Sequence, residues 1–347
     1  MPSPKRILVI RPGGIGDAVH LLSAIKVLRN YFPEAVIDIL AEKRNSAVFS
    51  LTRDIGTVFR YNNLSELRRI FKGHYDLVVD TEQWHRLSAV VARLTNAPMI
   101  VGYATNDRKK LFTHTVRYRH DCYEADSFVA LLEGLGINLP HSSSVPPLFI
   151  PEVAHERAAA LLGALIDRPF VAVFPGASIP ERRWSGDKFG AVSKKLHARG
   201  ISTVVVGGSD DWATGNRIIA GACGLNLAGR TSIPETAAII QRARLLVSGD
   251  SGILHIAVGL GTPTVSLFGP GIAKKWAPRG DHHVVINKCL PCSPCTRFGT
   301  TPRCPINARC MSDISVSEVV AAVDKLLEET ASESGFNDSN GNEKQFP

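Results

Sequence analysis

The hydrophobic positions along the chain form short apolar runs that alternate with stretches of helical period. In the first half, strands are predicted near residues 6–11, 36–40, 76–80 and 99–102, and helices near 17–31, 64–71 and 86–94. The pattern then restarts, with strands near 170–174, 202–206, 245–248 and 264–267, and helices near 153–164, 187–199, 210–221, 234–242, 252–258 and 315–329. This alternation is typical of parallel sheets covered by helices on both faces.

A Pro- and Ser-rich stretch without periodicity, residues 138–147, separates the two halves and is typical of an interdomain linker. We therefore predict an α/β protein with two Rossmann-like, doubly wound domains that face each other across a cleft. The expected segments are a first domain at 1–140, a linker at 141–151, a second domain at 152–330 and a disordered tail at 331–347. Ligands of such sheets bind in loops that follow the strands.

The length and composition limit the class of protein. A chain of 347 residues with 44% hydrophobic content can bury full cores in two domains. Its longest apolar runs are interrupted within about ten residues, short of the roughly 20 that a membrane-spanning helix needs. The strand-like run at 7–10 leaves no room for an export signal before it. We therefore expect a cytoplasmic protein.

The charge predicts an anionic partner. The formal net charge is +8, and residues 1–150 carry 19 Lys and Arg against 14 Asp and Glu. Nucleic acid is not expected, because neither an aromatic platform for single strands nor a recognition-helix pattern accompanies the basic residues. A phosphorylated or acidic acceptor near a membrane surface fits the charge, and so does a solvated basic surface without a specific partner.

The first loop with chemical content, RPGGIGD at residues 11–17, follows the first strand and opens a helix. Glycines at positions 13, 14 and 16 allow backbone N–H groups to approach an acceptor or its phosphate, so Gly13, Gly14 and Gly16 are candidate binding residues. The loop lacks the full G-x-G-x-x-G fingerprint of dinucleotide sites. Asp17 has two interpretations, a helix N-cap or a carboxylate that takes a proton from an acceptor hydroxyl.

A loop at the start of the second domain suits a diphosphate. The strand near 170–174 ends in a Pro-Gly-Ala-Ser turn, and two arginines follow it. Ser178 offers a hydroxyl there, and the guanidinium of Arg182 can bond two phosphate oxygens at once. The competing interpretation is a polar loop with ordinary surface arginines.

A second loop in this domain runs from an apolar strand into Gly-Asp-Ser-Gly and then a helix. The first N–H groups of that helix, at Ser251 and Gly252, form a natural seat for phosphate. His255 lies on the same helix face as Ser251, four residues on. A carboxylate beside phosphate is repulsive, so Asp250 is expected to accept hydrogen bonds from sugar hydroxyls. A simple helix cap would explain Ser251 but not the whole set.

Four motifs occur in a fixed order along the chain. They are RPGGIGD at 11–17, PGAS at 175–178 with RRW at 182–184, LAGRTS at 227–232 and GDSGxxH at 249–255. This ordered set resembles glycosyltransferase family 9, whose best-known members are the lipopolysaccharide heptosyltransferases, from about residue 5 to 325. The resemblance implies a GT-B fold that holds the acceptor mainly in the first domain and ADP-heptose in the second. It also implies inverting transfer that requires no metal or other cofactor.

The resemblance further implies roles for individual residues. Asp17 is implied as the general base that deprotonates the acceptor hydroxyl for attack on the anomeric carbon. The implied donor ligands are Ser178 and Arg182 for the diphosphate, Glu235 for the ribose, Asp250 for sugar hydroxyls, and Ser251, Gly252 and His255 for the phosphates. Many relatives carry lysine at the position of Arg182. The expected acceptor is an anionic lipopolysaccharide core, and the enzyme would associate peripherally with the inner face of the membrane.

Five cysteines lie within 22 residues, from Cys289 to Cys310. Four thiolates can close a tetrahedral zinc or iron site, and the preferred set is Cys292, Cys295, Cys304 and Cys310, with Cys289 as substitute. Within family 9, some autotransporter heptosyltransferases hold a structural iron, and many lipopolysaccharide enzymes have cysteines without a metal role. A structural zinc or iron therefore stays open at this point.

Three other functions remain open beside the leading one. The first is a protein-directed heptosyltransferase of the autotransporter type, which the cysteines keep in consideration. The second is a nicotinamide-dependent oxidoreductase, disfavoured because the glycine fingerprint is incomplete and Asp38 is a loose match for a ribose-binding acid. The third is a metal-containing nucleic-acid binder, which would leave the phosphate loops without purpose. The sequence leaves the acceptor hydroxyl and the oligomeric state undetermined.

Overall fold

The first domain is built on a six-stranded parallel sheet with the strand order β3-β2-β1-β4-β5-β6. The computed structural model describes residues 3–137, 139, 144–297 and 299–338. The strands are β1 (Arg6–Arg11), β2 (Val36–Ala41), β3 (Val58–Arg60), β4 (Leu77–Asp80), β5 (Met99–Tyr103) and β6 (His114–Val116). The helices are α1 (Ile15–Tyr31), α2 (Leu64–Phe71), α3 (Leu87–Leu94) and α4 (Glu124–Ala130), with 3-10 turns η1 (Ser46–Leu51), η2 (Asn106–Leu111) and η3 (Leu131–Leu135).

The second domain repeats this topology, with the order β9-β8-β7-β10-β11-β12. Its strands are β7 (Phe170–Phe174), β8 (Ser202–Val205), β9 (Gly224–Asn226), β10 (Leu246–Gly249), β11 (Thr264–Phe268) and β12 (His283–Asn287). Its helices are α5 (Glu152–Leu162), α6 (Gly186–His197), α7 (Trp212–Ile219), α8 (Ile233–Arg242), α9 (Gly252–Gly259), α10 (Ala273–Trp276), α11 (Arg309–Ser312) and α12 (Val316–Asp338). Short 3-10 turns occur at η4 (Gly163–Leu165), η5 (Pro180–Arg182) and η6 (Ser209–Asp211).

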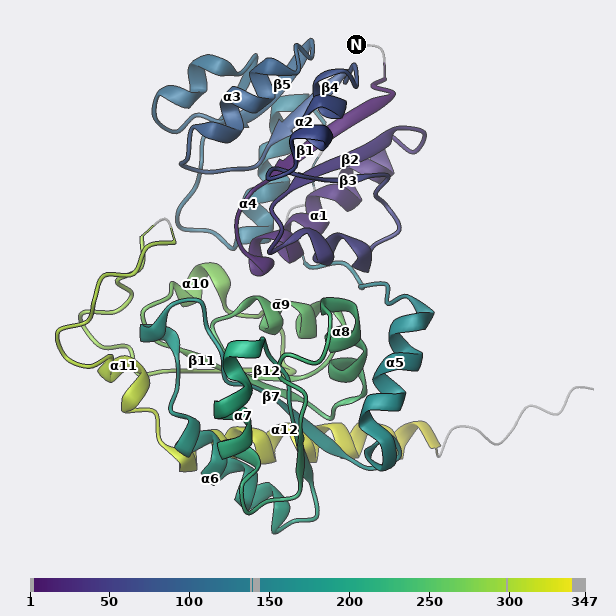
Figure 1. Ribbon diagram of the computed structural model, residues 1–347. Coiled ribbons are helices and arrows are strands. Elements are labelled where there is room, and N and C mark those ends of the chain that lie inside the picture. The colour runs from purple at the N-terminus through teal and green to yellow at the C-terminus, as the bar shows by residue number, and fades with distance from the viewer. Residues whose placement is uncertain (1–2, 138, 140–143, 298, 339–347) are drawn as a thin grey trace, which may run out of the picture.

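Each sheet reverses its strand order next to its first strand. The chain winds outward from β1 to β3 and then returns to place β4 on the other side of β1, and the second domain does the same around β7 and β10. Such reversal points are where open parallel sheets bind ligands. Figure 1 shows the two domains stacked, with α1 and α4 of the first domain facing α9 and α10 of the second. The predicted pair of doubly wound α/β domains is confirmed.

The domains share apolar packing. One cluster of buried side chains continues from Val19 and Leu22 of α1 into Ile253 and Ile256 of α9. The end of the predicted linker is bonded to both domains, because the N–H of Phe149 donates to Leu51 and the N–H of Leu148 donates to Gly259. The described part of the linker is therefore packed against both domains. Residues 138 and 140–143 lie outside the described residues.

The pattern missed four strands, and all four are at the edges of the sheets: β3, β6, β9 and β12. Edge strands are short and half-exposed, so they carry no continuous apolar run that would distinguish them. The helix predicted to end near residue 329 continues to Asp338, because the polar residues after it contain no proline to end it. The predicted disordered tail therefore overlaps this helix, and residues 339–347 lie outside the described chain.

None of the described helices has the length and apolar content needed to cross a bilayer.

Candidate active site

The starts of helices α1 and α9 meet where the two domains touch. A Cβ atom on Gly252 would lie 2.5 Å from Cβ of Ile15 and 2.9 Å from the backbone nitrogen of Gly16. A Cβ atom on Gly16 would lie 2.9 Å from Cδ2 of His255. Real Cβ atoms do not approach other atoms so closely, so these positions require glycine. The loops after β1 and β10, predicted separately from their motifs, are therefore neighbours.

Asp17 lies in the first turn of α1, and its side chain is partly accessible. Its Oδ2 accepts a hydrogen bond from the N–H of Gly14 at 3.2 Å, and its Oδ1 is 3.2 Å from Nη2 of Arg11. The N-cap residue of α1 is Gly14, so Asp17 is not the N-cap that one interpretation of the sequence proposed. It reaches back to the cap from the third helical position, and 23% of its side chain remains exposed. That exposed edge can receive a proton.

Arg11, the last residue of β1, is the buried partner of Asp17. Its Nη1 donates to the carbonyl oxygen of Thr81 at 2.8 Å, and its Nη2 lies 3.8 Å from Oε2 of Glu82. Burial works to lower the pKa of Arg11, but the carboxylates of Asp17 and Glu82, among others, raise it above its ordinary value. The guanidinium therefore stays charged although it is shielded from water.

The glycines before α1 serve these side chains. Gly13 adopts φ +118°, and a Cβ atom there would lie 2.7 Å from Nη2 of Arg11. A Cβ atom on Gly14 would lie 3.2 Å from Oδ2 of Asp17. The sequence predicted that these glycines let the backbone approach a ligand. In the structure, they leave room for the arginine and the carboxylate beside them.

A second arginine–aspartate pair lies in the other domain. Nη1 of Arg182, at the end of η5, is 3.0 Å from Oδ2 of Asp250, which follows β10 directly. The side chain of Asp250 is 6% exposed and that of Arg182 is 15% exposed. The pair is in contact without hydrogen-bond alignment: within the described residues, Oδ2 of Asp250 and Nε of Arg182 are buried and have no hydrogen-bond partner. Two polar atoms with unused bonding capacity suit a polar ligand.

The pKa of Asp250 is influenced by charges from both pairs. Burial raises it above its ordinary range, Arg182 opposes that rise, and the negative charge of Asp17 adds to it. Asp17 is next to Gly16 and Asp250 is two residues before Gly252, the two glycines that meet at the domain contact. The structure brings together Asp17, Arg182 and Asp250, three residues whose motifs are far apart in the sequence.

The start of α9 is capped as its sequence predicts. Ser251 is the N-cap, its Oγ accepts from the N–H of Leu254 at 3.4 Å, and it shares a hydrogen bond of 2.9 Å with Oγ of Ser248. Gly252 is the first helical residue, so its N–H is one of the four at a helix start without a partner inside the helix. This arrangement can hold an anion.

His255 occupies a buried interdomain position. Its Nδ1 is 3.1 Å from Nε2 of His20 on α1, and the two rings pack with Tyr123 and Trp276. Burial lowers the pKa of His255 to about 3, so the ring is neutral at physiological pH. The predicted contact of His255 with phosphate stays a prediction. His20 could not be selected from the sequence, because a lone histidine one turn into a helix is more often a packed or surface residue than a catalyst.

The loop after β7 has a structural arginine and an exposed hydroxyl. Ser178 is exposed, as a ligand contact requires. Arg183 donates from Nε and Nη2 to the carbonyl oxygen of Ala177, at 3.0 and 2.9 Å, and so closes the loop. A Cβ atom on Gly176 would lie 2.6 Å from Oδ2 of Asp211, so the glycine lets the loops after β7 and β8 approach each other. Of the two arginines, only Arg182 points to the Asp250 carboxylate.

Glu235 has a local structural role that its predicted ribose contact did not include. Its Oε2 accepts from the N–H of Ser232 at 2.6 Å, while Oγ of Ser232 accepts from the N–H of Glu235 at 3.4 Å. This reciprocal pair is the capping box of α8, and the Ser-x-x-Glu spacing signals it in the sequence. Oε1 of Glu235 lies 3.9 Å from Nε of Arg157.

Buried charges across the domain interface were not predicted. Nζ of Lys275 lies 2.8 Å from Oε2 of Glu124 and also contacts the hydroxyl of Tyr118. Burial raises the pKa of Glu124, and Lys275 opposes that rise. Nearby, Nη2 of Arg279 is 2.9 Å from Oδ2 of Asp126. These pairs join α10 and the segment after it to α4, and no spacing in the sequence indicates them.

The cysteines give the predicted metal site no support. Among the residues that the structure describes, no group of three or more Cys, His, Asp or Glu side chains is arranged to hold a metal ion. All seven thiols are free; in the predicted set, Cys310 is buried, Cys292 is exposed, and Cys295 and Cys304 are partly exposed. Backbone hydrogen bonds from residues 295 and 296 to Pro270 hold this loop against the end of β11.

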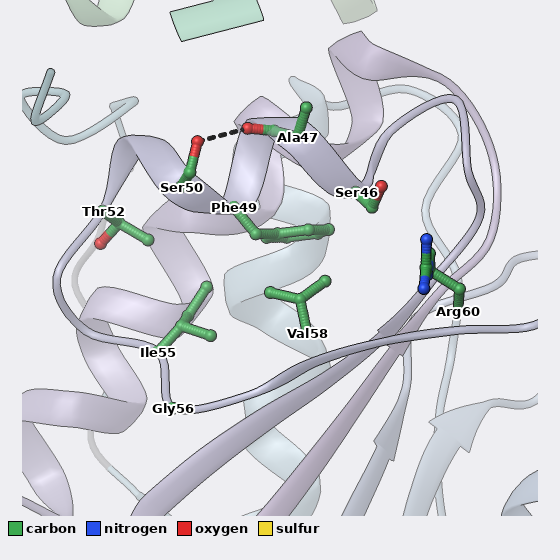
Figure 2. Close-up of a pocket in the computed structure, with 9 residues that line it drawn as sticks. All are labelled: Ser46, Ala47, Phe49, Ser50, Thr52, Ile55, Gly56, Val58 and Arg60. Atoms are coloured by element: carbon green, nitrogen blue, oxygen red, sulfur yellow. Dashed lines mark hydrogen bonds between the residues drawn. The ribbon is translucent and has the colours of Figure 1, made fainter. Parts of the chain in front are cut away.

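A separate hollow lies in the first domain, beside η1 and β3 (Figure 2). Its volume is about 450 Å³, and Phe49, Ile55 and Val58 line its apolar part. Ser46, Ser50 and Arg60 line its polar part. None of the predicted site residues borders it.

The two Rossmann-like domains that face each other form the GT-B architecture, and comparison with known proteins assigns the glycosyltransferase family. The family model "Glycosyltransferase family 9 (heptosyltransferase)" matches residues 64–304, so the chain belongs to that family. Lipopolysaccharide heptosyltransferase 3 of Escherichia coli is 28% identical over 338 residues, which are 90% of this chain and 96% of that protein. Membership of the family removes the oxidoreductase and nucleic-acid-binding alternatives.

Solved structures share the fold. A family 9 glycosyl transferase from Veillonella parvula superposes with a TM-score of 0.81 at 22% identity, covering 94% of this chain and 97% of that one. The E. coli ADP-heptose lps heptosyltransferase II superposes with a TM-score of 0.79 at 22% identity, covering 94% and 99%. The architecture predicted from the motif order is thereby confirmed.

Proposed function

We propose that this enzyme transfers heptose from ADP-heptose to a hydroxyl group of a lipopolysaccharide core, with inversion at the anomeric carbon. The observation that carries the proposal is the contact between the starts of α1 and α9, which places Asp17 and the Arg182–Asp250 pair in the same interdomain region. The relatives that match most of the chain are named as lipopolysaccharide heptosyltransferases, which supports a glycolipid acceptor over a protein acceptor.

Asp17 is the proposed general base. The acceptor oxygen attacks the anomeric carbon while the bond from that carbon to the ADP oxygen breaks. The hydroxyl proton passes to the Asp17 carboxylate, and ADP leaves with the bonding electrons. Direct attack opposite the leaving group inverts the anomeric configuration. Because one exposed edge of Asp17 remains accessible, a hydroxyl can reach it without displacing Arg11 or the N–H of Gly14.

The second domain is proposed to stabilise the leaving diphosphate. Negative charge builds on ADP as the bond breaks, and preorganised donors and positive charge stabilise that change. The free N–H groups at the start of α9, with Ser251 and Gly252, provide the donors. Arg182 provides the charge, and the exposed hydroxyl of Ser178 adds a further contact. No cofactor is needed in this scheme.

Asp250 and Glu235 are proposed to recognise hydroxyl groups of the donor. The unused Oδ2 of Asp250 can accept from a sugar hydroxyl, and Arg182 balances its charge. Oε2 of Glu235 belongs to the cap of α8, whereas Oε1 lies 3.9 Å from Nε of Arg157. Oε1 is the oxygen proposed to contact the ribose. His255 remains a predicted phosphate contact through its second ring nitrogen, since Nδ1 is engaged with His20.

The acceptor is proposed to be anionic and presented at the inner face of the membrane. The first half of the sequence carries a net charge of +5 and supports contact with phosphorylated or acidic core sugars. Cytoplasmic location with peripheral membrane association belongs to the same proposal.

Incubation with ADP-heptose and purified core acceptors of defined truncation tests the proposal. Mass spectrometry should detect the addition of one heptose to one of the truncated acceptors, and NMR of the product should give the anomeric configuration opposite to that of the donor. ADP-glucose in place of ADP-heptose is the control donor. Transfer to none of the acceptors, or retention of configuration, would contradict it.

A further inference from the structure

Besides its contact with Asp17, the Arg11 guanidinium is held by groups on several sides. The carbonyl oxygen of Thr81 accepts from Nη1, the ring of Phe128 lies 5.3 Å from the guanidinium carbon, and Glu82 lies beside Nη2. The side chain is only 3% exposed. A planar guanidinium fixed in this way has defined directions for the N–H groups of Nη2, the nitrogen nearest Asp17.

Glu82 is itself fixed. Its Oε1 accepts from the N–H groups of Trp84 and His85, at 2.9 and 3.1 Å. Burial would raise the pKa of Glu82, but Arg11 and these N–H groups hold it below its ordinary value, so the carboxylate is ionised. Arg11 therefore lies between a rigid, buried carboxylate and the more exposed carboxylate of Asp17. Its positive charge separates two negative groups that would otherwise repel each other.

Gly13 gives the guanidinium its space. Its φ of +118° is a conformation that other residues rarely adopt, and a Cβ atom at this position would lie 2.7 Å from Nη2. That nitrogen is the one that contacts Asp17. Any larger residue at position 13 must push the guanidinium away from the carboxylate.

We propose that Arg11 is a positioning residue for the base, and that Gly13 is required for this role. Arg11 fixes Oδ1 of Asp17 and the N–H of Gly14 fixes Oδ2, so the plane of the carboxylate is set. Each carboxylate oxygen has two lone-pair directions, which leaves the outward one free for the acceptor hydroxyl. This inference rests on the proposed role of Asp17.

The test uses Arg11→Lys, Arg11→Met and Gly13→Ala in the full-length enzyme. A misplaced base should lower kcat by about 10²-fold in Arg11→Met, while the calorimetric Kd for ADP stays unchanged. Arg11→Lys should lose less of its kcat, because an ammonium group keeps the positive charge although it lacks the planar set of N–H donors. Gly13→Ala should lower kcat although it keeps both charged groups. Circular dichroism and thermal unfolding of each variant check that the fold is intact.

Arg6→Met is the matched control. Arg6 lies at the opposite end of the same strand, and its Nη2 is 3.0 Å from Oδ2 of Asp38. Its removal breaks an arginine–aspartate pair of the same domain far from Asp17, so kcat should not change. An equal loss of kcat in Arg6→Met and Arg11→Met would overturn the proposal.

A double-mutant cycle on kcat distinguishes positioning from a general structural role. If Arg11 acts through Asp17, Arg11→Met should have little further effect in the Asp17→Asn background. Independent losses that multiply in the double variant would overturn the inference. If Arg11→Met does not fold, the cycle is run with Gly13→Ala. Full activity in Asp17→Asn would instead contradict the proposed function, so the two failures are distinguishable.

Discussion

Two arginine–aspartate pairs lie at the contact between the domains, Arg11–Asp17 from the first domain and Arg182–Asp250 from the second, and they are exposed in opposite ways. In the first domain the arginine is buried and the carboxylate of Asp17 reaches the surface. In the second domain the carboxylate of Asp250 is buried and Arg182 is the more exposed partner. The same type of ion pair therefore presents a carboxylate on one side of the interface and a guanidinium on the other.

Position in the fold explains this difference. Arg11 is the last residue of β1, and Asp250 directly follows β10. Both side chains therefore start beside neighbouring strands, where little water reaches them. Asp17 lies in the first turn of α1 and Arg182 lies in the 3-10 turn η5, both beyond the strand ends. In these two pairs the residue at the strand end is buried whatever the sign of its charge, and a more exposed partner neutralises it. The partner's identity then decides the chemistry offered to a ligand.

Asp17→Asn should have the largest effect, because it removes the group that the first pair exposes. The amide keeps the size of the side chain and cannot accept the proton, so kcat should fall by about 10²–10⁴-fold. Steady-state kinetics with saturating ADP-heptose measures the change. Turnover at the wild-type rate would show that the exposed carboxylate is not the base.

Arg182→Met should have the next largest effect, because it leaves the buried Asp250 without its charged partner. Removing one member of a buried pair lowers the free energy of unfolding by about 3–5 kcal/mol, and here partial exposure of Arg182 places the expected loss at or below the lower end. Affinity for ADP should fall as well. Denaturant unfolding and calorimetry measure the two effects.

Arg242→Met, on the exposed end of α8, is the control for that experiment, and its unfolding free energy should change by less than about 0.5 kcal/mol. If Arg182→Met matched this control in both stability and ADP affinity, the second pair would have no role in the site.

Acid should destabilise the contact between the two domains, because His20 and His255 are buried there as neutral rings. Because burial lowers the folded pKa of His255 to about 3, stability is fully present above the unfolded pKa near 6.5 and is lost as pH falls toward 3. The loss approaches about 1.4 kcal/mol per pH unit for each histidine that stays neutral only when folded. Urea unfolding from pH 7.5 to 4.5 measures it.

His255→Gln should make that pH dependence shallower, whereas His197→Gln, at an exposed position on α6, should leave it unchanged. An unchanged slope in His255→Gln would mean that the buried ring is not what makes the interface sensitive to acid.

Glu235→Gln should have the smallest effect on stability. It removes the charge from the capping box of α8, which an amide can still complete, and should lower the unfolding free energy by less than about 1 kcal/mol. The matched control is Glu318→Gln, because Glu318 accepts from the N–H of Ser315 in an equivalent arrangement at the start of α12. If Glu235 also meets the ribose, only Glu235→Gln should raise the KM for ADP-heptose. Equal KM values in the two variants would leave Glu235 with the cap alone.

The architecture and the loops of the site could be predicted from the sequence. The contacts that hold the side chains of the site in place could not. Central strands such as β1 and β10 are continuous apolar runs, and their following glycine motifs are local signals that need no tertiary information. The roles of Arg11, His20 and Lys275 depend on partners from distant segments, Glu82, His255 and Glu124. No spacing within a sequence encodes such contacts, and the cysteine spacing left open a metal site for which the described residues provide no group of ligands.

The most direct test of the division between the two pairs is a crossed measurement on Asp17→Asn and Arg182→Met. For each variant, kcat for heptose transfer and the calorimetric Kd for ADP are determined on the same preparation at the same pH. The account predicts that Asp17→Asn loses turnover and keeps the wild-type Kd, while Arg182→Met weakens ADP binding. Weakened ADP binding in Asp17→Asn together with an unchanged Kd in Arg182→Met would contradict it.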